Sequence, residues 1–183
     1  MFWKQKEKLY LGQFLRLYLQ GLLKSKIELP TNTEAKIDSD KFYEQLLYLR
    51  LIILMFLLLE IGRFGKQRYD LKSLGDLIQQ AFVLSLVDVG VTKGSAEKKA
   101  KDFMTQLDDY TGYLGKVNRD ELRKKGLYFH FILHFSDVIA GKGDIRDESF
   151  RFDSFTAFSY GNQIYKADKK ALKDMLNKVE FLD

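Results

Sequence analysis

The chain contains no cysteine and only one proline, Pro30, among its 183 residues. The absence of cysteine excludes disulfide bonds, thiolate metal sites and a cysteine nucleophile, and it suits a reducing compartment. All-β domains usually need many turns that contain proline, so a single proline argues against that architecture. A chain of this length buries about 70% of the surface that its unfolded form exposes, and therefore needs no covalent cross-links to fold as one domain.

Most of the chain also carries no net charge. After residue 26, the 24 basic side chains are matched by 24 acidic ones, whereas before it six basic residues face only Glu7. The net charge of +5 therefore belongs to the N-terminal segment. Such a segment favours an anionic partner, namely a membrane surface, ribosomal RNA or an acidic protein, although a solvated helix face has the same composition. The basic residues expected to bind this partner are Lys4, Lys6, Lys8, Arg16 and Lys24.

Motifs for catalysis are scarce. Gly141 and Gly143 lack both the preceding strand and the Gly-Lys-Ser/Thr ending of a phosphate-binding loop. Asp108 and Asp109 are adjacent, so on a helix their carboxylates point about 100° apart and make a poor acid–base pair. No nucleophile elbow is present either. We therefore expect no enzymatic activity, no cofactor and no small-molecule substrate.

The longest apolar run is Leu46–Ile61, which only Tyr48, Arg50 and Glu60 interrupt. A membrane span needs roughly 20 apolar residues, and a shorter run is more often the core helix of a soluble domain. Arg50 near a bilayer centre would cost about 2.5–3.5 kcal/mol. We therefore predict a buried helix that begins after Asp40 and ends near Gly62–Gly65, with a membrane span as the alternative.

The hydrophobic periodicity predicts a mostly α-helical single domain, residues 1–183, of about six to seven helices around this apolar helix. Residues 1–27 are expected to hold a basic amphipathic helix over 4–26, whose apolar face consists of Leu11, Phe14, Leu15, Tyr18 and Leu22. A polar connector, 27–40, follows it. The further helices expected are 70–89 before Gly90, Ser95 to Leu114, a short one capped by Asn118 and ending at Lys125, and a closing one over Lys166–Val179.

Two segments after Gly126 have sequence patterns that fit both a helix and a strand. Leu127–Phe135 alternates aromatic or aliphatic residues with other residues, which is a strand pattern, but the same letters suit a buried helix that ends at Gly141. We favour the helix. Phe150–Tyr160 is rich in aromatic residues and stays open in the same way, with a loop over Gly141–Ser149 before it. The fold class therefore leaves room for a minor β element after residue 126.

His130 and His134, the only histidines, form the candidate metal or haem site together with Asp137. On a helix the two imidazoles share a face and lie about 6 Å apart, within reach of one ion. On a strand they would be roughly 13 Å apart at about 3.3 Å per residue. The alternative is a pair of core histidines with ordinary hydrogen bonds, which is the interpretation that we favour.

A second basic cluster consists of Lys98, Lys99 and Lys101, in the first turns of the fourth predicted helix. Lysines at this end oppose the helix dipole, which has a small local cost. The cluster is either a solvated face or a contact for an external anionic partner. Together with the basic N-terminal helix, it supports a nucleic-acid- or ribosome-associated binding module as an alternative function.

The run Val89-Gly90-Val91, followed by Ser95, Lys98-Lys99 and Lys101, resembles the ubiquinol–cytochrome c (bc1 complex) chaperone family. Tyr113 is in the place of a tyrosine that follows the Lys-rich helix in that family, and the apolar helix from Phe42 is similar too. The likeness covers about residues 40–115. The chain differs from the family at Arg50, where members commonly have a histidine.

This resemblance implies an all-helical, non-enzymatic assembly chaperone or adaptor. Such a protein binds a hydrophobic client of the cytochrome b type, or a partner assembly factor, during assembly of a respiratory complex. It implies a cytoplasmic or mitochondrial-matrix location, peripheral to the inner membrane. Residues expected to contact the partner are the five basic ones of the N-terminal segment together with Lys98, Lys99, Lys101 and Tyr113.

Overall fold

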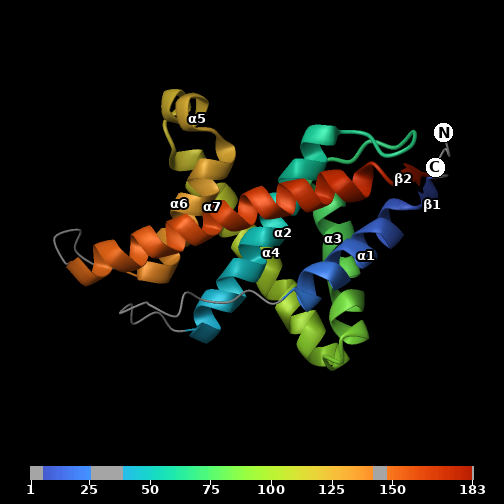
Figure 1. The fold of residues 1–183 in the computed structure, drawn as a ribbon, viewed down its shortest axis with the longest axis horizontal. Helices are drawn as coiled ribbons and strands as arrows, with labels where there is room; N and C mark the ends of the chain where they lie inside the picture. The colour runs from blue at the N-terminus through green and yellow to red at the C-terminus, as the bar shows by residue number, and fades with distance from the viewer. Residues whose placement is uncertain (1–5, 26–38, 142–147, 183) are drawn as a thin grey trace. The chain divides into compact units, whose positions relative to one another are not determined.

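A computed structural model describes residues 6–25, 39–141 and 148–182. The described chain is mostly α-helical, with seven helices and one two-stranded parallel sheet, which confirms the predicted fold class (Figure 1). The elements in chain order are β1 (Glu7–Leu9), α1 (Leu11–Lys24), α2 (Ser39–Ile61), α3 (Leu71–Asp88), α4 (Lys93–Lys116), α5 (Arg119–Lys125), α6 (Leu127–Ala140), α7 (Glu148–Leu176) and β2 (Val179–Phe181).

The chain divides into two compact units. The first unit comprises Met1–Ile27, Leu54–Met104 and Lys169–Asp183, and the second comprises Glu28–Ile53 and Thr105–Asp168. Helices α2, α4 and α7 each contribute residues to both units. The single domain predicted from the sequence stays a prediction, and the two units are described separately below.

The first unit joins the two ends of the chain through its sheet. Strands β1 and β2 pair in parallel, with Glu7 opposite Val179 and Leu9 opposite Phe181 (Figure 1). The Phe181 ring packs edge-on against Phe14 of α1, at 5.3 Å between centroids. The prediction of a helix from residue 4 is therefore wrong at its start, because residues 7–9 are extended and α1 begins only at Leu11.

Helix α1 packs on α3 in the first unit. The apolar face predicted for it is buried, from Leu11 through Phe14 to Leu22. On α3, Asp70 caps the N-terminus by accepting a hydrogen bond from the Ser73 backbone N–H at 2.7 Å. The helix ends at Asp88, and Gly90 follows with φ at +95°, the left-handed conformation predicted for it.

Helix α2 is the predicted apolar helix. It ends at Ile61, directly before Gly62, as expected, but Asp40 lies inside its first turn and is not its N-cap. By length and composition it could cross a membrane, yet 72% of its most apolar stretch is buried inside the protein. Its one buried cation, Arg50, donates two hydrogen bonds to the Asp168 carboxylate of α7 in the second unit, at 2.8 and 2.7 Å.

In the second unit both ambiguous segments are helical. Leu127–Phe135 belongs to α6, which ends before Gly141, and residues 150–160 belong to α7. The minor β element after residue 126 is β2, at the end of the segment predicted as a closing helix. Helices α6 and α7 approach closely at Gly161, where an added Cβ would lie 2.8 Å from Cγ2 of Ile132. A larger residue at this position would force Ile132 or one of the helices to shift.

Helices α4 and α5 begin close to the predicted positions. Helix α4 starts at Lys93, so Ser95 lies in its first turn and not before it, and the helix continues through Gly115. Asn118 caps α5 as predicted, since its side-chain oxygen accepts from the Asp120 N–H at 2.8 Å. Most of the expected connector 27–40 and most of the expected loop Gly141–Ser149 fall outside the described residues.

Candidate functional site

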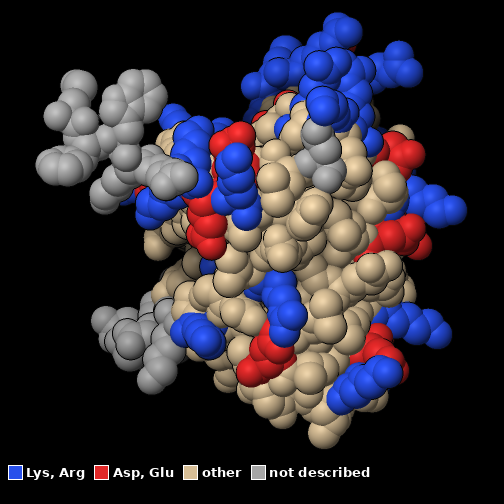
Figure 2. Space-filling model, turned by 90° about the vertical axis from the view of Figure 1, so that its right-hand side faces the viewer, with Lys and Arg blue, Asp and Glu red and all other residues tan. Residues whose placement is uncertain are grey.

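The basic residues predicted in the N-terminal segment have different surroundings. Lys6 is exposed directly before β1 and Lys8 is exposed on it. Lys24 is exposed at the end of α1, and Lys4 lies outside the described residues. On the face of the protein drawn in Figure 2, Lys and Arg side chains gather at the upper end and mix with Asp and Glu below it. Exposed basic side chains are thus available to an anionic partner.

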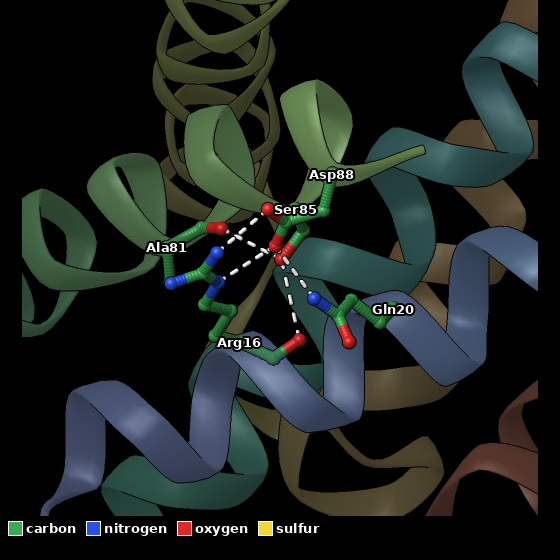
Figure 3. Close-up of polar contacts among 5 residues, drawn as sticks. All are labelled: Arg16, Gln20, Ala81, Ser85 and Asp88. Carbon is green, nitrogen blue, oxygen red and sulfur yellow. Dashed lines mark hydrogen bonds and ion pairs between the residues drawn. The ribbon is translucent and has the colours of Figure 1, made fainter. Parts of the chain in front are cut away.

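Arg16 differs from these lysines because its charge is already paired. Its Nε and Nη2 atoms donate to the two carboxylate oxygens of Asp88 on α3, each at 2.6 Å, and Gln20 donates to the same carboxylate (Figure 3). The hydrogen bonds from Arg16, and then that from Gln20, hold the pKa of Asp88 below its ordinary value. This cluster joins α1 to α3, so Arg16 has a structural partner that the sequence did not indicate.

A hydroxyl completes the contact between α1 and α3. The Ser85 Oγ donates to the backbone carbonyl of Arg16 at 3.3 Å and to that of Ala81 at 2.8 Å (Figure 3). Ser85 is fully buried, so these bonds satisfy a polar group that would otherwise be costly to bury. The cluster of Arg16, Gln20, Ser85 and Asp88 fixes the position of α1 on α3.

The second basic cluster is separated from Tyr113. Lys98 and Lys101 are exposed and Lys99 is half-buried, all three in the part of α4 that belongs to the first unit. Tyr113 lies in the part of α4 that belongs to the second unit. Twelve positions separate Lys101 from Tyr113, or about 18 Å along a helix. The structure therefore does not bring these predicted residues into one site.

Tyr113 instead packs against a histidine. The His134 ring stacks on Tyr113, with 4.5 Å between centroids and 19° between planes, and it meets Tyr110 edge-on. The Nε2 atom of His134 lies 2.8 Å from the Asp109 carboxylate. Burial, followed by the negative charges of Asp137 and Glu121, raises the pKa of Tyr113. These contacts hold α4 and α6 together in the second unit.

The two histidines do not converge on a common point. His134 interacts with Asp109, whereas His130 is 2% exposed and neither of its ring nitrogens has a hydrogen-bond partner in the described part of the chain. Asp137 is an exposed residue, but its carboxyl group is partly shielded from water, and this desolvation raises its pKa. Among the described residues, no three His, Asp or Glu side chains are grouped so that they could hold a metal ion.

An apolar groove opens on the first unit between the ends of α2 and α7. We call it the leucine groove. Its volume is about 360 Å³, and its apolar lining consists of Leu57, Ile61, Leu172 and Leu176. Ile61 is 45% exposed, whereas Leu57 and Leu172 beside it are buried. Its lining also includes the charged residues Glu60, Lys169 and Lys173.

A second concavity lies in the second unit, where α5, α6 and α7 meet. We call it the aromatic pocket. Its volume is about 420 Å³. Its lining is mostly aromatic, with the four rings of Tyr128, Phe129, Phe158 and Tyr165. The other lining residues are Ile132, Gly126, Asn162 and Lys125.

The rings of the aromatic pocket brace one another. Tyr128 of α6 stacks on Tyr165 of α7 at 4.7 Å, and Phe129 meets Phe158 edge-on at 5.4 Å. The Lys125 ammonium lies 5.2 Å from the centroid of the Phe129 ring and 3.0 Å from a Glu121 carboxylate oxygen. The rings are thus held in defined orientations, with one cation placed beside them.

Sequence analysis did not identify either concavity. Tyr128, Phe129 and Ile132 of the aromatic pocket come from Leu127–Phe135, and Phe158 comes from Phe150–Tyr160, the two segments whose secondary structure stayed open. Their excess of aromatic residues was a usable signal, but only the pairing of α6 with α7 shows which rings meet. The leucine groove needs the proximity of residues more than 100 positions apart, from Ile61 to Lys169 and beyond.

Comparison with known proteins does not assign this chain to a family. The resemblance to the bc1 chaperone family consequently rests on the residues quoted for it and stays a prediction. No protein-family model, no curated protein and no solved structure matches this chain.

Proposed function

We propose that this protein is a non-enzymatic assembly chaperone or adaptor that holds an apolar helical segment of a protein client. The observation that carries the proposal is the leucine groove of the first unit, where Ile61 is exposed beside Leu57, Leu172 and Leu176. An amphipathic helix laid into such a groove buries its apolar face against these side chains.

The apolar contact supplies a modest binding energy. Burying one Leu or Ile side chain fully is worth about 1.5–3 kcal/mol, and association itself costs several times that amount. A client anchored by two or three apolar side chains therefore binds weakly and reversibly. Reversible binding suits a chaperone, which must release its client when assembly proceeds.

Charge supports a particular kind of client. Lys169 and Lys173 border the groove, and exposed Lys6, Lys8 and Lys24 lie in the same unit. Each Lys close to an anionic membrane surface contributes about 1 kcal/mol. A client segment next to anionic lipid, in a membrane protein of the cytochrome b type, would meet both the apolar groove and this positive charge. The proposed location is therefore peripheral to an energy-transducing membrane, on its cytoplasmic or matrix side.

The test compares two matched substitutions in the first unit. Ile61→Asn makes the groove polar, whereas Leu71→Asn changes a side chain of similar exposure, 41% against 45%, outside it. A photo-crosslinking residue at position 61 or 176 of the full chain should capture cytochrome b from detergent-solubilised membranes. Ile61→Asn should reduce co-purification of cytochrome b several-fold, while Leu71→Asn leaves it unchanged.

Two outcomes contradict the proposal. One is equal recovery of cytochrome b with both variants, because the groove would then play no part. The other is recovery of no cytochrome b and no partner assembly factor, together with normal bc1 complex levels in a deletion strain.

A further inference from the structure

We propose that the aromatic pocket of the second unit is a binding site for a small organic anion that carries a flat ring. This site is independent of the proposed client groove, since the two concavities share no residue and belong to different units. The size of the pocket, its walls and the charge at one of its sides support this assignment.

The size of the pocket fits a small molecule. Its volume of about 420 Å³ is within the range of about 300–1,000 Å³ that ligand pockets usually have. Such pockets are mostly apolar, with a few polar groups that orient the ligand. Here the polar groups of the side chains are the Lys125 ammonium, the Asn162 amide and two tyrosine hydroxyls.

The walls favour a flat, unsaturated ligand. Aromatic rings attract other rings in offset or edge-on arrangements, beyond the gain from buried area alone. Four rings are already held in place by the pairs Tyr128–Tyr165 and Phe129–Phe158, and each pair has one ring from α6 and one from α7. Preorganised rings lose little conformational entropy when a ligand binds. Gly161, in the same stretch of α7, keeps that helix close to α6 and so keeps the pocket walls in place.

Positive charge at one side of the pocket favours an anion. Lys125 lines the pocket and belongs to the last turn of α5, which also carries Arg123 and Lys124. Gly126 lines it as well and is the N-cap of α6, where no side chain caps the first turn. The N-terminus of a helix presents backbone N–H groups and a partial positive charge to an anion. A carboxylate or sulfonate at this side would meet both the ammonium and the helix end.

Asn162 supplies an orienting group on the opposite helix. It lines the pocket from α7, and its side-chain amide has no hydrogen-bond partner within the described residues. An amide both donates and accepts, so it can bind a polar ring substituent of either kind. The ligand class is therefore an aryl or heteroaryl carboxylate or sulfonate, with its acid group toward Lys125 and its ring against the aromatic walls of the pocket.

The test uses 8-anilinonaphthalene-1-sulfonate as the probe, because its fluorescence rises in an apolar site and its sulfonate supplies the negative charge. Uncharged N-phenyl-1-naphthylamine is the matched neutral probe. Titration of the full chain should show saturable binding of one sulfonate per chain. Lys125→Gln should weaken the sulfonate about three-fold to ten-fold, because a charge-assisted contact is lost from a partly exposed position. The neutral probe should change little.

Three further variants make the test specific. Lys124→Gln removes the same charge from the same turn of α5 without touching the pocket lining, and should leave sulfonate affinity nearly unchanged. Glu121→Gln removes the carboxylate that faces Lys125 and should tighten sulfonate binding. Asn162→Phe fills the pocket and should abolish binding of both probes, with circular dichroism as the check on folding.

Several results would overturn the proposal. Equal weakening by Lys124→Gln and Lys125→Gln would mean that only general surface charge attracts the sulfonate. Unchanged binding in a folded Asn162→Phe variant would place the probe elsewhere. Displacement of the probe by an acidic peptide with a single Phe, at lower concentration than by naphthalene-1-sulfonate, would identify a peptide site and not a small-molecule site.

Discussion

Arg50 and Asp168 are 118 positions apart in the chain, yet their side chains form a two-pronged ion pair inside the second unit, with N–O distances of 2.8 and 2.7 Å. Arg50 is 8% exposed and Asp168 5%. The planar guanidinium matches the two carboxylate oxygens, which is the geometry that favours Arg over Lys in buried pairs. The pair explains how the long, mostly buried apolar helix α2 tolerates a charge near its middle.

The first prediction concerns the loss of one partner of this pair. Asp168→Ala removes the carboxylate that accepts two hydrogen bonds from the buried Arg50 guanidinium, and we expect the free energy of unfolding to fall by about 3–5 kcal/mol. Replacing both residues, Arg50→Met with Asp168→Leu, removes both charges and should restore most of that stability. Urea unfolding followed by circular dichroism at 222 nm measures both changes.

Arg63→Met is the control for this experiment, because Arg63 is exposed and its replacement should change the free energy of unfolding by less than about 0.5 kcal/mol. A loss below about 1 kcal/mol for Asp168→Ala would contradict the prediction. Arg50 would then find other partners when Asp168 is absent, and the pair would contribute little to the fold.

The Arg50–Asp168 pair also shows where sequence analysis ends. The apolar run predicted a buried helix correctly, and glycines at positions 62, 90 and 141 predicted where helices end. Those signals are local. A partner 118 positions away leaves no such signal, and neither does the pairing of β1 with β2 across the whole chain.

The limits at the candidate sites have the same physical cause. Leu127–Phe135 satisfies a period of two and also suits a helix that is apolar on most sides, so periodicity alone could not choose between them. The choice depends on α7, whose Gly161 lets it approach α6. The basic residues were identified correctly as charges, but Asp88 as the partner of Arg16 required the packing of α1 on α3.

The second prediction concerns this Arg16–Asp88 pair and pH. The folded state lowers the pKa of Asp88 from its ordinary value of 3.8, chiefly through the hydrogen bond from Arg16. A carboxyl with a lowered pKa stabilises the fold fully above its unfolded pKa and loses that contribution as the pH falls through the folded pKa. We therefore expect Asp88→Asn to reduce the loss of stability that the protein shows below about pH 4.

Urea midpoints measured between pH 2 and pH 6 test this prediction. The difference between the natural chain and Asp88→Asn should shrink as the pH falls, and it should also shrink in high salt because the pair is exposed. Asp76→Asn, an exposed carboxylate on the same helix, is the control. A difference that is constant across the pH range would mean that Asp88 acts through packing and not through its charge.

The third prediction concerns the close approach at Gly161. An alanine Cβ there would lie 2.8 Å from Ile132 Cγ2, which forces α6 and α7 apart, and overpacking of this kind costs about 1–3 kcal/mol. Gly115→Ala is the matched control, since a Cβ at this position of α4 meets no atom within 4 Å. It should stabilise the protein by about 0.5–1 kcal/mol, because alanine is the better helix former.

Thermal unfolding of the two variants measures the difference. Both substitutions add one methyl group to a helical glycine of the second unit, so opposite signs of the change in melting temperature isolate the contact between helices. Stabilisation by Gly161→Ala would show that Ile132 moves aside at no cost. In that case Gly161 would not fix the distance between the walls of the aromatic pocket.

The last prediction concerns His130, whose side chain is buried in α6 with neither ring nitrogen paired to a described residue. An unpaired buried polar group costs about 1–3 kcal/mol, whereas an apolar side chain of similar volume carries no such cost. We therefore expect His130→Leu to raise the free energy of unfolding by about 1 kcal/mol or more. His134→Leu should do the opposite, because His134 interacts with Asp109 and stacks on Tyr113. Unfolding of both variants in urea tests this prediction. A destabilised His130→Leu variant would contradict it, because the imidazole would then make a stabilising polar contact that its position beside Phe129 does not reveal.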